Sequence, residues 1–585
     1  MIRRWRPAAA VMALLMALVV VAGCAAIPDE TPAQGIAAGD GGGKAAPVPD
    51  PPSGLAPADL VRAFLDANAD STSSYAAGRP YLTKAAQGRW QPASSITIIQ
   101  NTYNTLPEQT KPDQAKVLLT AQIIGRLGSD FAFVPASTPT TLTIELDKQD
   151  GQWRISSPPP GVFMTLDRFN EVYRQTRVYF LDPQKRVLVP DLRYIVAQPA
   201  SGLPGRVIDR LLAGPSDAMQ GAVTSALSPE AVLATGVTET GDGAVLVNLS
   251  HPGDTGSAGN VKLMIAQIVQ SLAGVTNNRI RVEVEGAALS SERLDWRIGD
   301  LPAYDIGTSP GPDLTGLLVH DGRVKQLADG KPINGPAGNG SYTVLTAAQS
   351  IDGTELATIS KPGANAELRV GGLTQAASVV DLTAGTLTRP TWVSADSATD
   401  PSNEVWTVAD GSRVARVVKS ADGTWVARSV NSNDLSQLGT ITDLRLSRDG
   451  TRAAVIANSQ LIVCAVVRTP NSDTVALRSP RPLLPDALTS VVGVDWLLQD
   501  QLVVATSSPE SPIVQVAADG DPVFSRYNAA NLTAPVTAVT AAPSRSVIVV
   551  DAGGMWTSSD SGSVWRVQGG VNVGRGSSAV PFYPG

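Results

Sequence analysis

The sequence predicts a multidomain protein in which two α+β domains precede an all-β propeller of five or six blades. The chain has 585 residues and 43% of them are hydrophobic, so about three or four domains with separate cores are expected. Up to about residue 290, helical and strand patterns follow one another, which is typical of α+β domains. Beyond residue 300, short apolar runs separated by turn residues indicate strands alone.

Residues 1–23 have the pattern of an export signal. Arginines near the start precede an uninterrupted apolar run over 8–22, which is at the short end for a membrane span of about 20 residues. The run ends in Val21, Ala22, Gly23 and Cys24. This ending resembles the lipobox of bacterial lipoproteins, which implies an S-linked diacylglycerol and an N-acyl chain on Cys24. The alternative is a plain secretory signal with an incidental cysteine.

Residues 24–53 form a predicted tether between the lipidated cysteine and the folded domains. They are rich in Ala, Gly and Pro and carry almost no large apolar side chain, so they cannot bury a core. Loss of the signal removes three arginines and no acid, which changes the net charge from −7 to −10. An acidic chain gains no attraction to an anionic membrane and has no basic stripe for nucleic acid. We therefore expect the acyl chains to hold the protein on the extracytoplasmic face of the cell membrane.

Residues 54–170 are predicted to form the first α+β domain. The segment "PADLVRAFLDANA" (57–69) places apolar residues at helical spacing. Strand-like runs follow over 115–127 and 140–162, and the second contains a hairpin around Asp150 and Gly151. A helix followed by a curved antiparallel sheet resembles the NTF2-like cone, and no polar cluster here argues for a ligand inside it.

Residues 171–298 are predicted to form the second α+β domain. A strand pair over 176–195 is followed by a short helix, a strand, a long amphipathic helix with Asn260 as its N-cap, and an alternating strand over 278–286. This order, with "VYFLD", "LLAGP", "VLVNLS" and "QIVQSL", resembles the GerMN domain of spore-germination and sporulation proteins. The resemblance implies a cell-envelope module for interaction or scaffolding, without established catalysis.

Residues 299–585 are predicted to form the propeller. "QSIDGTELATIS" (349–360) and "LSRDGTRAAVIAN" (446–458) are similar to each other, and weaker echoes follow over 494–507 and 540–553. Their spacing fits a period of roughly 45 to 50 residues, typical of blades that bury both faces only when stacked in a ring. The run over 314–330 is expected to complete a sixth blade or to close the ring against the C-terminus. "SSDSGSVW" resembles the Asp-box, a structural hairpin device, through Ser558, Asp560, Gly562 and Trp565.

The order of all these parts is more specific than any one of them. A lipobox, a Pro/Gly tether, an α+β domain, a GerMN-like domain and a C-terminal propeller together resemble the actinobacterial lipoprotein LpqB family. The resemblance implies an accessory protein of the MtrA–MtrB two-component system. Such a protein binds the extracytoplasmic domain of the sensor kinase MtrB and modulates signalling that affects cell-wall homeostasis and division.

The chain offers few residues for catalysis. Its two histidines, His251 and His320, lie in turn-like segments, and no G-x-S-x-G nucleophile elbow is present. Cys464 lies in an apolar strand-like run, where a buried thiol is expected. We therefore expect no enzyme activity, no metal and no cofactor. Two alternatives stay open: an envelope lipoprotein that binds cell-wall glycan or peptide, and a propeller glycosidase or lyase whose carboxylates come from different blades.

Overall fold

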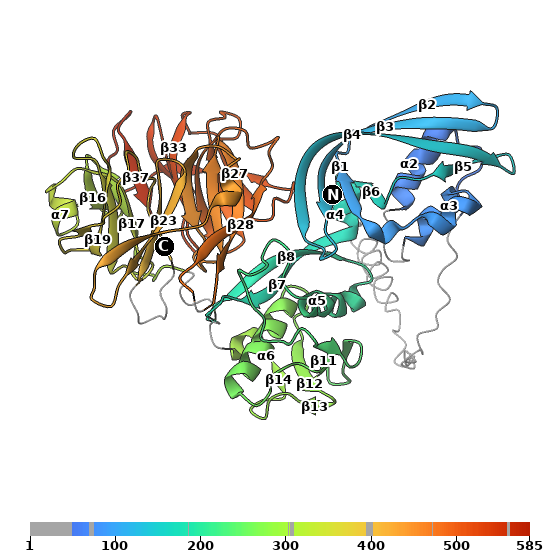
Figure 1. The fold of residues 1–585 in the computed structure, drawn as a ribbon, viewed down its shortest axis with the longest axis horizontal. Helices are drawn as coiled ribbons and strands as arrows, with labels where there is room; N and C mark the ends of the chain where they lie inside the picture. The colour runs from blue at the N-terminus through green and yellow to red at the C-terminus, as the bar shows by residue number, and fades with distance from the viewer. Residues whose placement is uncertain are drawn as a thin grey trace, which may run out of the picture. The chain divides into compact units, whose positions relative to one another are not determined.

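The computed structural model describes residues 50–68, 75–184, 186–301, 304, 309–393, 402–470, 472–558 and 562–585 (Figure 1). Residues 48–585 form one compact unit. Within it, a first domain, a second domain and a C-terminal propeller follow one another along the chain, so the predicted fold class of two α+β parts and a propeller is confirmed.

The first domain packs helix α2 (Pro57–Ala67) and the short helices α3 (Lys84–Arg89) and α4 (Leu166–Val172) against a mixed sheet. Helix α2 begins with a proline at N1 and buries its apolar face, as the spacing predicts. The sheet has the order β5-β4-β3-β1-β6, and β2 pairs with β3. Its strands are β1 (Ile96–Ile99), β2 (Asn104–Lys111), β3 (Gln114–Leu127), β4 (Phe133–Gln149), β5 (Gln152–Ser157) and β6 (Val162–Thr165). The hairpin predicted around Asp150 joins β4 to β5, and the NTF2-like assignment stays a prediction.

The second domain begins with a two-stranded hairpin, β7 (Tyr173–Leu181) and β8 (Leu188–Val196). Helix α5 (Leu203–Leu212) follows, and helix α6 (Ala258–Leu272) joins the parallel strands β11 (Ala244–Ser250) and β12 (Arg279–Val284). The sheet is completed by β9 (Val232–Leu233), β10 (Thr238–Glu239), β13 (Ala287–Ala288) and β14 (Asp295–Trp296). Both helices, the hairpin and the sheet share one apolar core.

The predicted cap of helix α6 is wrong by three residues. Ser257 is the N-cap, because its side chain accepts the backbone N–H of Asn260. The Asn260 side chain instead donates to the carbonyl oxygen of Asp254 (2.8 Å), in the loop before the helix. Ser, Asn and Asp all occur near the start of the helix, and the sequence alone does not decide which of them is its N-cap.

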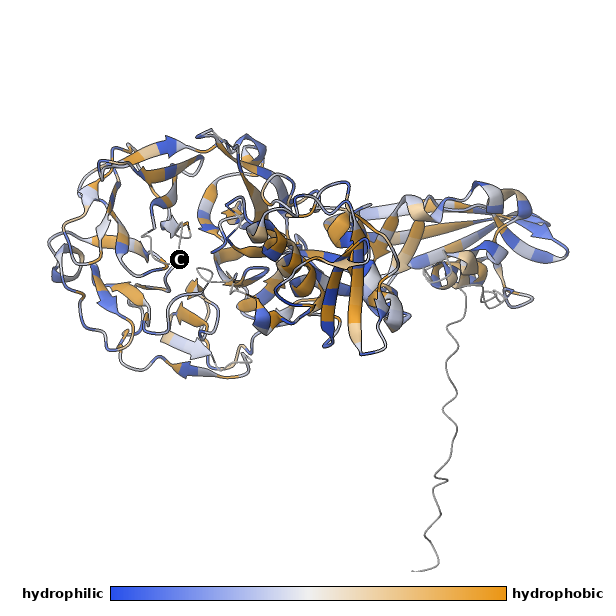
Figure 2. Ribbon diagram, turned by 90° about the horizontal axis from the view of Figure 1, so that it is seen from below, coloured by the Kyte–Doolittle hydropathy of each residue, from blue (hydrophilic) through white to orange (hydrophobic). Residues whose placement is uncertain are grey.

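The propeller consists of six sheets in the described part of residues 309–585, and Figure 2 shows them arranged as a ring. Blade 1 contains β15 (Leu317–His320), β16 (Arg323–Gln326) and β37 (Ala579–Phe582). Blade 2 contains β17 (Val344–Gln349), β18 (Glu355–Ser360), β19 (Glu367–Gly372) and β20 (Ser378–Val379). Blade 3 contains β21 (Thr391–Trp392), β22 (Glu404–Ala409), β23 (Arg413–Lys419) and β24 (Trp425–Ser429).

The remaining blades follow the same four-stranded pattern. Blade 4 contains β25 (Ile441–Leu446), β26 (Arg452–Ala457), β27 (Gln460–Arg468) and β28 (Val475–Pro482). Blade 5 contains β29 (Val491–Leu498), β30 (Gln501–Thr506), β31 (Ile513–Ala517) and β32 (Ser525–Arg526). Blade 6 contains β33 (Val536–Thr540), β34 (Ile548–Asp551), β35 (Gly554–Ser558) and β36 (Trp565–Val567).

The ring is closed by its own last strand. Strand β37 pairs with β15 and contacts both β33 and β17, so segments more than 250 residues apart complete blade 1. The first strands of neighbouring blades contact one another and form the inner wall of the ring. This closure leaves few exposed sheet edges, which is how propellers avoid edge-to-edge association.

The repeated sequence S-x-D-G-T corresponds to a turn after the innermost strand. In blade 4, the Asp449 carboxylate accepts hydrogen bonds from Ser447 Oγ (2.6 Å) and from the backbone N–H of Thr451 (2.9 Å). In blade 2, Asp352 accepts from Thr354 Oγ1 at 2.7 Å in the same way. The repeat is thus a local Asx turn that connects the innermost strand of the blade to the second strand of the same blade.

Candidate functional site

The β7–β8 hairpin is where the three domains meet. Its Tyr194 belongs to the apolar core of the first domain, whereas Val178 and Phe180 belong to the core of the second. The Arg177 guanidinium pairs with Asp500 of blade 5 at 2.5 Å. Within the compact unit, this hairpin therefore couples both α+β domains to the propeller.

A buried ion pair fixes the first domain to the second. The Arg193 side chain is fully buried and donates to Asp191 (2.6 Å), to the Asp130 carbonyl (2.7 Å) and to the Gly214 carbonyl (3.0 Å). Asp191 also accepts the backbone N–H and the hydroxyl of Ser216 at 2.7 and 2.8 Å. These bonds compensate the loss of hydration on both charges, as a buried pair requires.

An acid cluster lies between the hairpin and blade 5. Tyr194 donates its hydroxyl to Asp521 (2.6 Å), and Gln175 donates to Tyr194 (3.0 Å) and to Asp519 (3.3 Å). In the described residues, no lysine or arginine forms an ion pair with either carboxylate. Burial and the neighbouring Asp521 raise the pKa of Asp519 to about 7, and burial raises the pKa of Asp521 as well. The contact therefore changes its charge near neutral pH.

A small cavity lies beside this cluster. It has a volume of about 40 Å³ and is lined by residues of all three domains, including Asp191, Ser216, Arg452 and Asp519. One terminal nitrogen of Arg452 is buried without a hydrogen-bond partner among the described residues, whereas the other donates to the Pro190 carbonyl. The size and polarity suit ordered water rather than a substrate.

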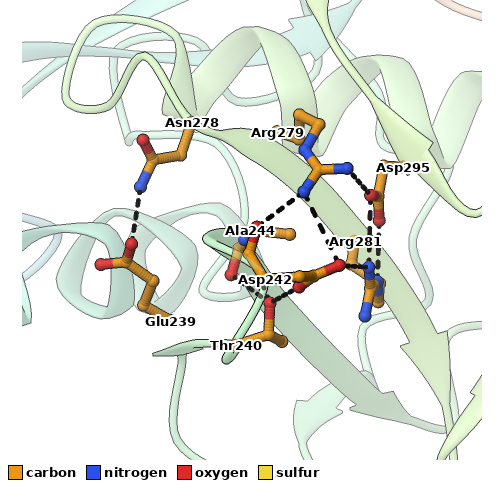
Figure 3. A network of polar contacts seen from close by, with 8 residues as sticks. All are labelled: Glu239, Thr240, Asp242, Ala244, Asn278, Arg279, Arg281 and Asp295. Carbon is orange, nitrogen blue, oxygen red and sulfur yellow. Dashed lines mark hydrogen bonds and ion pairs between the residues drawn. The ribbon is translucent and has the colours of Figure 1, made fainter.

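The exposed strand face of the second domain carries a charge network (Figure 3). Arg281 pairs with Asp295 and with Asp242, both at 2.7 Å, and Arg279 pairs with Asp295 at 2.8 Å. The Thr240 hydroxyl and Arg281 lower the pKa of Asp242 to about 2. Because each charge already has a partner within the domain, this face presents no free cation or anion cluster to a partner protein.

Apolar side chains are exposed at one end of the second domain instead. A hollow of about 230 Å³ is lined by Val269, Ile280, Ile298 and neighbouring polar residues. Ile298 is 50% exposed, and Leu294, a few residues earlier, is also 50% exposed. An exposed apolar side chain that lines a hollow with a polar rim is typical of a protein contact surface.

A polar hollow of about 680 Å³ lies on the first domain. Trp90, Glu145, Asp147 and the segment 156–161 line it. Trp90 is only 5% exposed, and its indole N–H donates to the Gly161 carbonyl at 3.0 Å. The hollow therefore lacks the exposed aromatic face on which a sugar ring would stack.

The predicted lipidation residues lie outside the described part of the chain. This applies to the signal over 1–23, to Val21, Ala22, Gly23 and Cys24, and to all but the end of the tether. In the Asp-box-like segment, Asp560 also lies outside it. Ser558 is buried on β35, Gly562 packs with positive φ against Tyr527, and Trp565 is buried between blades 5 and 6.

The histidines and Cys464 occupy separate positions, and of the three only Cys464 lines the small cavity beside the acid cluster. His251 occupies an exposed turn with positive φ after β11, and His320 ends β15, with Nδ1 3.2 Å from the Ser578 carbonyl. Cys464 is buried in the core of blade 4, and burial raises its thiol pKa to about 12. The described residues contain no group of three or more His, Cys, Asp or Glu side chains placed to hold a metal ion.

Three protein-family models match the chain in succession. They are "Lipoprotein LpqB, N-terminal domain" over residues 50–170, "Sporulation and spore germination" over 177–290, and "Lipoprotein LpqB beta-propeller domain" over 321–584. Lipoprotein LpqB of Mycolicibacterium smegmatis is 33% identical, covering 93% of this chain and 94% of the relative. This chain belongs to the lipoprotein LpqB family.

Other LpqB proteins are similar over almost their whole length. Lipoprotein LpqB of Rhodococcus opacus is 30% identical, covering 98% of this chain and 97% of the relative. Among solved structures, the β-propeller domain of Myceliophteria thermophila Cps50 (Swd1) is 14% identical, with a TM-score of 0.29, covering 43% of this chain and 78% of that chain. A TM-score this low does not define a shared fold.

Family membership supports a lipoprotein attached to the membrane of the cell envelope. None of the helices in the described ranges has the length and hydropathy of a membrane-spanning segment. The junction residues Arg193, Asp519 and Tyr194 were not found from sequence, because they are single polar residues whose partners lie up to 344 positions away. The exposed Ile298 and Leu294 were also missed, since an isolated apolar residue in a loop carries no pattern.

Proposed function

We propose that this LpqB protein is anchored on the extracytoplasmic face of the cell membrane through Cys24, where it binds and modulates an MtrB-type sensor histidine kinase. The observation that carries the proposal is membership of the LpqB family over almost the whole chain. The role is that of a binding protein, without catalysis. Its two histidines and Cys464 occupy structural positions, which supports this part of the proposal.

The kinase contact is assigned to the apolar end of the second domain. Ile298 is half exposed and lines a hollow, and Leu294, four residues earlier, is also half exposed, so burial of these side chains by a partner would remove apolar surface from water. The charged face in Figure 3 is less suited, because Arg279 and Arg281 already have carboxylate partners within the domain. A partner would have to compete with these ion pairs.

The test is a titration of the full-length protein, in detergent, against the extracytoplasmic domain of the co-resident MtrB-type kinase. We compare three variants that place a charge on an exposed apolar residue of each domain: Leu106→Glu, Ile298→Glu and Val567→Glu, at positions 66%, 50% and 69% exposed. Ile298→Glu is expected to weaken binding at least tenfold, about 1.4 kcal/mol, and the other two to leave it unchanged.

Other outcomes are equally informative. No saturable binding of the unaltered protein at tens of micromolar would contradict the kinase proposal itself. Loss of binding only in Leu106→Glu or Val567→Glu would move the interface to the first domain or the propeller. The anchor has its own test: Cys24→Ala should release the folded protein from the membrane fraction, and normal retention of this variant would contradict lipidation at Cys24.

A further inference from the structure

Three arginines converge at the centre of the propeller. Arg445 lies on β25, Arg448 follows in the next turn, and Arg389 lies two residues before the start of β21. Two carboxylates, Asp443 and Asp495, lie among them on the innermost strands β25 and β29. The cluster thus carries one more positive than negative side chain, in a region that these inner strands enclose.

Arg448 is satisfied by neutral acceptors. It is 5% exposed and donates to the carbonyls of Pro584 (3.2 Å), Trp496 (2.7 Å) and Ala541 (2.9 Å). It therefore ties blades 4, 5 and 6 to the end of β37. Its partners are fixed backbone atoms, so Arg448 has a structural role.

Arg445 is only partly satisfied. It is 2% exposed, and one terminal nitrogen donates to the Pro390 carbonyl at 2.6 Å. The other terminal nitrogen lies 3.4 Å from an Asp443 oxygen without forming a hydrogen bond, and Nε has no partner in the part of the chain that is described. A buried guanidinium thus retains two unpaired donors next to Arg389.

Arg389 donates no hydrogen bond to any described residue. Its side chain is 13% exposed, its Nε is buried without a partner, and its nearest carboxylate oxygen, on Asp495, is 4.0 Å away. That carboxylate is already engaged, because it accepts from Thr540 Oγ1 (2.8 Å) and from the Ala541 N–H (3.1 Å). Burial and the neighbouring Arg445 lower the pKa of Arg389 to about 9.

Water reaches the inner strands from one end. Leu345 and Val492, the second residues of β17 and β29, are 50% and 44% exposed, whereas Asp495, three residues further along β29, is 6% exposed. The arginine cluster therefore lies at the inner limit of solvent access. The two carboxylates compensate the three buried cations only in part, and an entering anion would balance the remaining positive charge.

We propose that the centre of the propeller binds a small oxyanion, a carboxylate or phosphate group, between Arg389 and Arg445. Planar guanidinium groups donate two parallel N–H bonds to such groups, and the unpaired Nε donors of both arginines are suited to this geometry. The site is separate from the surface proposed for the kinase, and it goes beyond the proposed function.

The test uses inorganic phosphate and acetate as probes of the full-length protein, with sodium chloride at matched ionic strength to separate binding from screening. Calorimetric titration should give one site per chain for at least one oxyanion. Whichever of phosphate and acetate binds more tightly indicates whether the natural ligand carries a phosphate or a carboxylate group. Arg389→Met should weaken this binding at least tenfold, whereas the matched change of an exposed propeller arginine, Arg566→Met, should not.

Equal binding by Arg389→Met and the unaltered protein would overturn the proposal, as would identical responses to phosphate, acetate and chloride. A second measurement does not depend on any variant. Crystals of the protein soaked in selenate, an oxyanion with an anomalous signal, should show a selenium peak between the guanidinium groups of Arg389 and Arg445, with selenate oxygens about 2.7–2.9 Å from their nitrogens. A map without that peak would also overturn the proposal.

Discussion

Two buried arginines of this chain have opposite surroundings. Arg193, at the domain junction, forms hydrogen bonds to one carboxylate and two carbonyls, all at 3.0 Å or less. Arg389, at the propeller centre, forms none with the described residues and has its nearest carboxylate at 4.0 Å. Both side chains have lost most of their hydration, but only at Arg193 do hydrogen bonds to protein acceptors replace it.

The difference separates a structural charge from a charge available to a ligand. The acceptors around Arg193 come from the first and second domains and engage both of its terminal nitrogens, so the arginine holds two domains together. Only its buried Nε has no partner among the described residues. At Arg389 the donors are present but none of them bonds to an acceptor among the described residues, which is the arrangement of an anion site. Substitutions at the two positions should therefore have very different costs.

The largest effect is expected for Arg193→Met. The change leaves Asp191 buried and without its cation, which typically costs about 3–5 kcal/mol. Urea unfolding followed by circular dichroism should show this as a lower midpoint for the transition of the two α+β domains. The matched change at the propeller, Arg389→Met, removes no hydrogen bond and should cost less than about 1 kcal/mol. An equal loss of unfolding free energy in Arg193→Met and Arg389→Met would contradict the distinction between the two arginines.

The second-largest effect is expected at Asp519, a carboxylate that forms no ion pair with a lysine or arginine among the described residues. Its pKa is raised from 3.8 to about 7, so between these values the folded protein holds a proton that the unfolded chain has lost. Stability from this group is therefore present below about pH 4 and is lost as the pH rises through 7. Asp519→Asn should remove that loss and stabilise the protein by about 1–3 kcal/mol at pH 8.

Thermal unfolding of both proteins at pH 5 and pH 8 measures this. The gain from Asp519→Asn should be larger at pH 8 than at pH 5, because pH 5 lies only about one unit above the unfolded value of 3.8, so only part of the loss has accumulated there, whereas the whole loss is present above the folded pKa of about 7. A gain that is independent of pH would show that protonation of Asp519 is not its cause. Asp217→Asn, which alters an exposed aspartate near the same junction, is the control.

The features predictable from sequence are those with a local cause. Helix α2 follows from the spacing of Leu60, Val61 and Phe64, and the turn around Asp352 follows from a short repeated motif whose side chains bond to their own backbone. The cap of helix α6 was mispredicted because Ser257 and Asn260 are both good caps, and only the loop geometry decides between them.

The candidate sites were not predictable, for a different reason. Arg389 differs from the other arginines only in what surrounds it, and its neighbours Arg445 and Asp495 come from separate blades. Likewise, Tyr194 and Asp521 are 327 residues apart, and their contact exists only once the domains have packed. A single sequence records periodicity and composition, but it does not record which buried polar groups lack a partner.

The smallest effect is expected on the charged face of Figure 3, where Asp242→Asn should leave the urea midpoint at pH 7 unchanged. Asp242 is 51% exposed, and Arg281 keeps its bond to Asp295 at 2.7 Å when Asp242 is lost. Exposed ion pairs contribute little and are screened by salt.

Asp295→Asn is the matched variant, at a residue whose side chain is 14% exposed. It should lower the urea midpoint, because it deprives both Arg279 and Arg281 of a partner that they share. The pKa of Asp242 is about 2, so the small contribution of its charge to stability is present above about pH 4 and is lost only as the pH falls through 2. A difference in urea midpoint between Asp242→Asn and the unaltered protein that grew toward pH 9 would contradict this pH dependence.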